Sequence, residues 1–218
     1  MLPSVKASLI TAFDASFAAV MARLGLDEAA GYVTALSGGP DSTALALLTQ
    51  RYANAAGKRH HAVIVDHGVR DGSGNEAERV QTRIRRFGIT SDIIQITEPR
   101  PTAGLQEWAR TNRHHVLLSA SRQKKAALFF AHHASDQAET VAMRLLKSSG
   151  LNGLGGIACH RMQHDVVVAR PVLGWMPDQL KAVCHHLGCD FEIDPSNQNH
   201  QFERVRIRKL LADLDRQD

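Results

Sequence analysis

The chain is 218 residues long, with 44% hydrophobic residues, 22% charged residues and a formal net charge of +4. This length suits one compact domain, and no apolar run reaches the roughly 18 residues that a membrane span requires. Cys159, Cys184 and Cys189 form no CxxC pair, so we read them as reduced thiols of a cytoplasmic protein. Most of the 26 basic residues are Arg. A high Arg content favours nucleotide or nucleic-acid binding, but an Arg-rich solvated surface with no binding role explains it equally well.

The first expected element is an N-terminal amphipathic helix rather than a signal peptide, because apolar residues recur there at helical spacing. These residues are Leu9, Phe13, Phe17, Val20, Met21 and Leu24.

Strands and helices then alternate four times. The expected strands are residues 31–36, 60–65, 91–96 and 126–131, and the expected helices begin at residue 41 or cover residues 75–87, 105–120 and 136–146. Four successive strand–helix units predict an α/β fold with a doubly wound, mostly parallel sheet and helices on both faces.

A less regular segment follows this core. We expect a glycine-rich loop at 150–158, a strand at 165–173, a helix at 177–187, a turn at 194–197 and a basic helix at 202–211. The predicted organisation is one domain over residues 1–218, with its core at about 30–150 and a small irregular C-terminal extension at about 151–218.

Polar segments follow three of the expected strands. They cover residues 37–42, 66–70 and 132–137. In doubly wound sheets, ligands bind beyond the carboxyl ends of the strands, where loops meet helix N-termini. We therefore expect the ligand site at this edge.

The first of these segments, SGGPDS, has the composition of a phosphate-binding loop. Gly38 and Gly39 allow positive φ and a close backbone approach, and Ser42 lies in the first turn of a helix, where free N–H groups attract an anion. The segment matches neither GxxxxGK[ST] nor GxGxxG. A plain strand-to-helix turn with a serine cap would leave Asp41 unexplained.

The same segment resembles the pyrophosphate-binding loop of the N-type ATP pyrophosphatases, the PP-loop proteins with an adenine nucleotide alpha hydrolase-like fold. A longer ordered series is similar to one family among them, the tRNA(Ile)-lysidine synthases, from about Tyr32 to Leu211. It comprises VDHGVR at 65–70 with Ser73 and Glu76, Ala109–Arg110 with Arg113, residues 132–157, RPVL at 170–173, DPSN at 194–197 and FERVRIR at 202–208.

The resemblance implies a reaction on the wobble cytidine of an isoleucine tRNA with a CAU anticodon. ATP adenylates the carbonyl oxygen at C2 of the base, pyrophosphate leaves, and the ε-amine of free lysine displaces AMP to give lysidine. The implied cofactors are ATP and Mg²⁺, and the implied class is a ligase that forms a C–N bond.

The resemblance also implies roles for particular residues. Catalysis would rest on Asp41, Asp136 and His133, and Asp41 and Asp136 would hold the metal ion. The ATP site would comprise Ser37, Gly38, Gly39, Pro40, Asp41, Ser42, Asp66 and His67, and the substrate and tRNA contacts would come from Arg110, Arg113, Glu139, Arg204 and Arg208. Asp136 has a purely structural alternative, as the N-cap of a helix with Glu139 completing a capping box.

Three positions depart from the family pattern. Ser135 replaces an aspartate, His114 a tyrosine and Val205 an asparagine. Two alternatives therefore stay open: a divergent PP-loop enzyme that adenylates another substrate, and a nucleotide-binding partner module with impaired catalysis. The family's further tRNA-docking domains are expected to be absent, so we expect weak tRNA binding unless a homodimer supplies a second basic surface.

Overall fold

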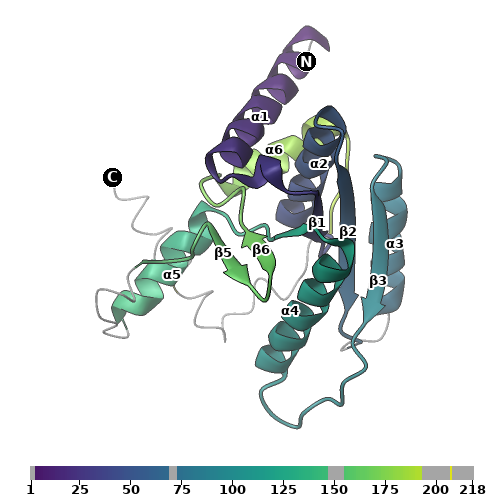
Figure 1. The fold of residues 1–218 in the computed structure, drawn as a ribbon, viewed down its shortest axis with the longest axis vertical. Coiled ribbons are helices and arrows are strands. Elements are labelled where there is room, and N and C mark those ends of the chain that lie inside the picture. The colour runs from purple at the N-terminus through teal and green to yellow at the C-terminus, as the bar shows by residue number, and fades with distance from the viewer. Residues whose placement is uncertain (1–2, 69–72, 147–154, 193–206, 208–218) are drawn as a thin grey trace.

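The computed structural model describes residues 3–68, 73–146, 155–192 and 207. The chain forms a central sheet with helices packed on its two faces (Figure 1). In chain order the elements are α1 (Pro3–Arg23), the short 3₁₀ helix η1 (Leu26–Glu28), β1 (Gly31–Ala35), α2 (Pro40–Ala55), β2 (Arg59–Asp66), α3 (Ser73–Arg85), β3 (Thr90–Gln95), α4 (Leu105–Lys124), β4 (Ala127–Phe129), α5 (Ala134–Leu146), β5 (His160–Gln163), β6 (Val166–Ala169) and α6 (Pro177–Leu187).

The sheet has the strand order β3-β2-β1-β4-β6-β5. All neighbouring strands are parallel except β5, which pairs antiparallel with β6 at one edge. The chain moves outward from β1 through β2 to β3 and then returns to place β4 on the other side of β1. This reversal makes the boundary between β1 and β4 the topological switch point, and the predicted doubly wound α/β fold is confirmed.

Apolar side chains fill the space on both faces of the sheet. On one face, α1, α2, α3 and α6 cover a core that includes Phe17, Leu45, Ile84 and Val183. On the other face, α4 covers a smaller core that includes Leu117 and the valines of β1 and β2. Strands buried on both faces explain why the sequence shows continuous apolar runs there instead of an alternating pattern.

Two differences from the expected elements matter for the site. Strand β5 was not predicted, because its sequence, HRMQ, is polar and largely exposed at the sheet edge. Helix α5 begins at Ala134 rather than Asp136, so Asp136 is the third helical residue. Among the described residues, no helix is long and apolar enough to cross a membrane.

Candidate nucleotide-binding and catalytic site

The loop after β1 and the residues after β4 lie next to each other because their strands are neighbours. Val33 of β1 is in register with Leu128 of β4, and both strands point to the same edge of the sheet. Residues 37–42 and residues 132–137 therefore meet at the switch point, as the sequence predicts. Ligands bind at this place in doubly wound folds.

The loop at residues 37–42 is held in shape by its own hydroxyl groups. Ser42 Oγ accepts a hydrogen bond from the Ser37 N–H at 3.1 Å and donates one to the Gly39 carbonyl at 3.1 Å. Thr43 Oγ1 donates to the Gly38 carbonyl at 3.3 Å. Gly39 is the N-cap residue of α2 and no side-chain hydrogen bond caps that end, so the first-turn N–H groups face the loop. This arrangement suits a phosphate and argues against a simple serine cap.

Residues from two distant segments press on the outside of the loop. Gly38 has φ +86°, and a Cβ atom there would come within 2.5 Å of Val80 Cγ2 on α3. The Glu192 N–H donates to the Gly38 carbonyl at 2.8 Å, and the Glu192 carboxylate pairs with Arg83 of α3 at 2.5 Å. The glycine is therefore required both by its backbone conformation and by the space that α3 leaves.

Cys184 supports the same loop from α6. Its Sγ lies 3.5 Å from the Pro40 carbonyl, at hydrogen-bond distance for a thiol, and the residue is fully buried. Burial raises the pKa of Cys184 to about 12 and that of Cys189 to about 11. Both groups are neutral thiols at physiological pH, which fits a packing role and makes them poor nucleophiles.

His133 joins the loop to the segment after β4. Its Nε2 lies 3.7 Å from Asp41 Oδ2 and 3.5 Å from Asp136 Oδ2. The imidazole is 8% exposed, and its Nδ1 is buried without a hydrogen-bond partner among the described residues. The three residues predicted to be catalytic are thus brought together in the structure, with the imidazole between the two carboxylates.

Asp136 also stabilises the start of α5, but not as the N-cap. His133 is the N-cap residue, and its backbone N–H donates to Asp136 Oδ2 at 3.1 Å. This is the contact that the third helical residue makes in a capping box. The alternative structural role of Asp136 is therefore real, although its position differs from the predicted one, and one carboxylate oxygen serves both contacts.

Asp66 is the last residue of β2, and His67 follows it at the same edge of the sheet. Asp66 is 9% exposed, and its Oδ1 accepts a hydrogen bond from the Gly68 N–H at 2.8 Å. Burial lowers the pKa of His67, and the nearby positive charge of Arg113 lowers it further. Arg113 of α4 is exposed and close enough to His67 for the two charges to interact.

A buried arginine that was not predicted as a site residue lies next to His132. Arg170, 9% exposed, donates from Nε to His132 Nδ1 at 3.2 Å and from Nη1 to the Ala158 carbonyl at 2.8 Å. Burial lowers the pKa of Arg170, and the charges of Arg161 and Arg110 lower it further. The bond to Nδ1 places the proton of a neutral His132 on Nε2.

The remaining predicted residues have mixed outcomes. Arg110 is exposed on α4, whereas Glu139 of α5 is only 1% exposed. Arg204, Arg208 and the departure at Val205 lie outside the described residues. His114 stacks on Phe130 with ring centroids 5.6 Å apart, and its Nε2 lies 2.9 Å from Gln163 Oε1. His114 stands where the tRNA(Ile)-lysidine synthase pattern has a tyrosine. Its imidazole has both a stacking partner and a polar contact there.

Sequence reasoning missed the residues that support the site from a distance, namely Val80, Arg83, Arg170, Cys184 and Glu192. Only Arg170 carried a signal, because it opens the RPVL segment that resembles the family. The others reach the loop through contacts between segments that lie far apart in the chain, which no local pattern records.

The described residues contain no group of three or more His, Cys, Asp or Glu side chains that could hold a metal ion by itself. Two carboxylates, those of Asp41 and Asp136, do face the same imidazole. A Mg²⁺ ion is commonly held by one or two carboxylates together with substrate phosphates and water. The donor set therefore fits Mg²⁺ that arrives with a nucleotide, and does not fit a resident metal bound only by protein.

The fold and the site together define a doubly wound α/β domain with a phosphate-binding loop at its switch point. A family model for the PP-loop domain matches residues 10–214. The chain belongs to this family of ATP-binding domains.

Curated relatives narrow the comparison. The chain is 40% identical over 183 residues to a tRNA(Ile)-lysidine synthase of Bradyrhizobium sp., and the match covers 83% of this chain and 51% of that protein. It is 41% identical over 192 residues to the tRNA(Ile)-lysidine synthase of Methylobacterium nodulans, covering 88% and 56% respectively. The chain thus spans about half the length of these relatives.

Solved structures share the fold at lower identity. A U34-tRNA thiolase from Methanococcus maripaludis, solved with its [4Fe-4S] cluster, superposes with a TM-score of 0.80 at 17% identity, over 96% of this chain and 74% of that one. An NH₃-dependent NAD synthetase from Campylobacter jejuni superposes with a TM-score of 0.55 at 17% identity, over 98% and 84%. At this identity the likeness shows the fold alone.

Proposed function

We propose that this chain carries out ATP-dependent ligation of lysine to the wobble cytidine of tRNA(Ile), and that AMP and pyrophosphate are released. The observation that carries the proposal is the contact between the loop at residues 37–42 and the His133–Asp136 segment, which brings Asp41, His133 and Asp136 together. The chain matches tRNA(Ile)-lysidine synthases over about half of their length. The names of these relatives support RNA and lysine as the substrates.

The loop would bind the phosphates of ATP. The first-turn N–H groups of α2 and the Gly38–Gly39 backbone offer donors to the phosphate oxygens, and the helix dipole adds a partial positive charge. Asp66 and His67 at the end of β2 would frame the adenosine. When it is bound, Mg²⁺ held by Asp41 and Asp136 would neutralise charge on the phosphates.

His133 and the two carboxylates would then handle the incoming amine. The ε-amine of lysine is an ammonium ion in water and must lose a proton before it can attack C2 of the base. A carboxylate beside the amine stabilises the ammonium form on arrival, and an imidazole at 3.5 to 3.7 Å from both carboxylates is placed to accept the proton. Arg110 and Arg113 on α4 would contact the RNA phosphates at the same edge.

We also propose that free lysine is the amine substrate and that residues 1–218 form one catalytic domain. A homodimer would supply additional RNA contacts.

The direct test is a transfer assay with the 218-residue chain. ATP, Mg²⁺, labelled lysine and an unmodified tRNA(Ile) transcript with a CAU anticodon are mixed, and label is sought in the RNA. The matched control is the same transcript with uridine in place of the wobble cytidine, which leaves the rest of the RNA unchanged. We expect label only in the first transcript.

The products separate the alternatives. AMP without label in RNA would identify an adenylating enzyme with another acceptor. ATP binding without AMP in any mixture would identify a nucleotide-binding partner module. Either result would contradict the proposed function.

A further inference from the structure

The edge of the sheet opposite the candidate site is lined by basic side chains. Strand β2 begins at Arg59, β3 follows Arg85 and Arg86, and β4 follows Lys124 and Lys125. Because these strands are parallel, their first residues lie along one edge. We call this group the basic rim, and it consists of Arg59, Arg85, Arg86, Arg122, Lys124 and Lys125.

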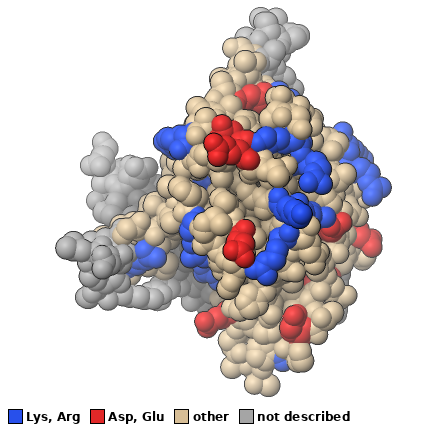
Figure 2. Space-filling model, viewed as in Figure 1, with Lys and Arg blue, Asp and Glu red and all other residues tan. Residues whose placement is uncertain are grey.

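One face of the molecule carries many Lys and Arg side chains. Figure 2 shows them over the upper and middle parts of the view, with Asp and Glu side chains among them. Five of the six rim residues are exposed, and only Lys124 is half-buried. Arg122 extends the group toward β6, since its Nη2 donates to the His164 carbonyl at 2.8 Å.

Acidic residues near the rim do not neutralise it. Asp92 lies 3.1 Å from Lys124 Nζ and 2.8 Å from His61 Nε2. Burial lowers the pKa of His61, so it adds little positive charge at pH 7. Asp27 and Glu28 precede β1 at the same edge. Among the described residues, none of the other five rim cations forms an ion pair.

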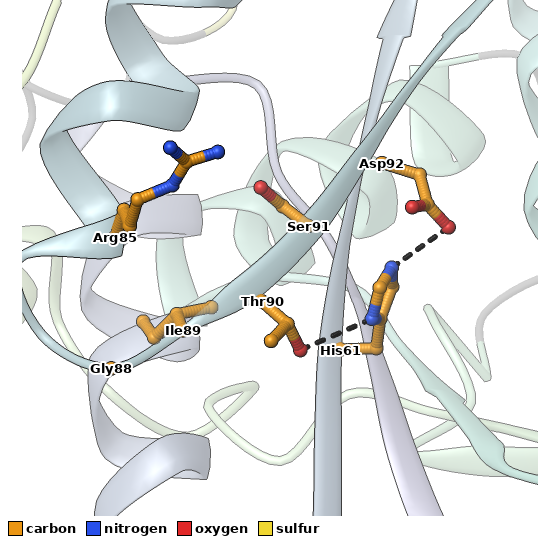
Figure 3. A pocket seen from close by; sticks show the side chains of 7 residues that line it. All are labelled: His61, Arg85, Gly88, Ile89, Thr90, Ser91 and Asp92. Atoms are coloured by element: carbon orange, nitrogen blue, oxygen red, sulfur yellow. Dashed lines mark hydrogen bonds and ion pairs between the residues drawn. The ribbon is translucent and has the colours of Figure 1, made fainter.

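A hollow at the start of β3 opens beside these cations. Its volume is about 410 Å³, and Figure 3 shows Arg85 on one side of β3 and His61 with Asp92 on the other. Thr90 and Ser91 contribute hydroxyl groups, and Thr90 Oγ1 lies 3.2 Å from His61 Nδ1. The Arg85 guanidinium and the Ser91 hydroxyl suit a phosphate group, and the Asp92 carboxylate that also lines the hollow lies against Lys124 and His61.

We propose that the basic rim and this hollow bind the sugar–phosphate backbone of the RNA substrate, away from the base that reacts. The inference rests on the proposed function for the identity of the RNA. Charge complementarity supports it, because mostly unpaired cations at the starts of β3, β2 and β4 match a row of phosphates better than a single small anion. Strand β2 has eight residues, so the two edges are about 26 Å apart. A double-stranded RNA-binding domain covers roughly 16 base pairs of duplex. A duplex of that length is long enough to span the distance between the two edges.

The experiment measures tRNA binding as a function of salt concentration. The rim variant is Arg59→Gln with Arg85→Gln, and the control variant is Arg51→Gln with Lys181→Gln. Both variants lose two positive charges, but Arg51 and Lys181 already pair with Asp14 and Asp178. We expect the rim variant to bind tRNA about 10-fold more weakly near 0.1 M salt, with the slope of log K against log salt reduced by about 1 to 2. We expect the control to bind like the wild type.

Equal binding and equal salt slopes for the rim variant and the wild type would overturn the inference, as would an equal loss in the control. Two further measurements keep it separate from the proposed function. The Kd for ATP should be unchanged in both variants. Lysine transfer at saturating tRNA should also be unchanged in both variants. If the wild type transfers lysine and the rim variant binds tRNA as tightly as the wild type, the inference about the rim is refuted while the proposed function stands. RNA binding through the rim without any lysine transfer would support the rim and contradict the proposed function.

Discussion

The carboxyl edge and the amino edge of the sheet hold their charged groups in opposite ways. At the carboxyl edge, Asp66 is bound to a backbone N–H and Asp41 and Asp136 surround a buried imidazole. At the amino edge, the basic rim is exposed and mostly without ion pairs among the described residues. Fixed, partly buried groups suit chemistry, because they need little reorganisation in the transition state. Exposed cations suit a salt-sensitive contact with a polyanion.

The strongest test of the carboxyl edge is Asp41→Asn. The amide keeps the shape of the side chain but removes the negative charge that faces His133 and the expected metal ion. We expect AMP production to fall by about 10²- to 10³-fold or more, with the fold unchanged by circular dichroism. AMP release at the wild-type rate would refute the role of this carboxylate.

Asp136 and Ser135 test whether charge or helix capping matters more at α5. Asp136→Ala removes the charge and the bond to the His133 N–H, and the capping loss alone should cost about 1 kcal/mol of stability. We expect lysine transfer to fall about 100-fold, well beyond that effect. Ser135→Asp should keep or raise activity, because it restores the pair of adjacent carboxylates in the tRNA(Ile)-lysidine synthase pattern. If Ser135→Asp abolishes ATP binding, the pocket is built for a different ligand.

Gly38→Ala tests the close packing of the loop against α3. The new Cβ would meet Val80 Cγ2 at 2.5 Å and would also be strained at φ +86°. Gly57→Ala is the matched control, because Gly57 has φ +62° but no neighbouring atom within 4 Å of the place that a Cβ would take. We expect a loss of about 1 kcal/mol in the control and about 2 to 4 kcal/mol for Gly38→Ala in urea unfolding. ATP affinity should fall only in Gly38→Ala, and equal losses would remove the packing argument.

A smaller effect is expected at β2, beside the amino edge, from His60. Its imidazole lies 2.9 Å from both Thr34 Oγ1 and Gln50 Oε1, and burial lowers its pKa to about 3. The unfolded chain takes up a proton near pH 6.5 that the folded chain does not bind, so stability falls as the pH drops below that value. Between pH 7.5 and 5.5 we expect the wild type to lose about 1.4 kcal/mol more than His60→Gln. The check is urea unfolding at both pH values, and parallel losses would contradict the assignment.

The sequence predicts the two edges unequally. The α/β alternation and SGGPDS locate the loop and the switch point because both signals are local. Strand β5 escapes prediction because its polar residues pair only through the hairpin with β6. The contacts of Glu192 with Gly38, and of Arg170 with His132, depend on folding of distant segments. The basic rim is likewise invisible along the chain, because its residues are scattered over positions 59–125 and gather only when parallel strands align.

The central claim is that the carboxyl edge transfers AMP from ATP to an RNA base. The most direct test is exchange of labelled pyrophosphate into ATP, measured in the absence of lysine. The account predicts exchange that requires tRNA(Ile) with its CAU anticodon, because the base is the acceptor and the first step is then reversible. Exchange without RNA, or exchange that requires lysine but no RNA, would contradict it, since the adenylated species would then be something other than the base.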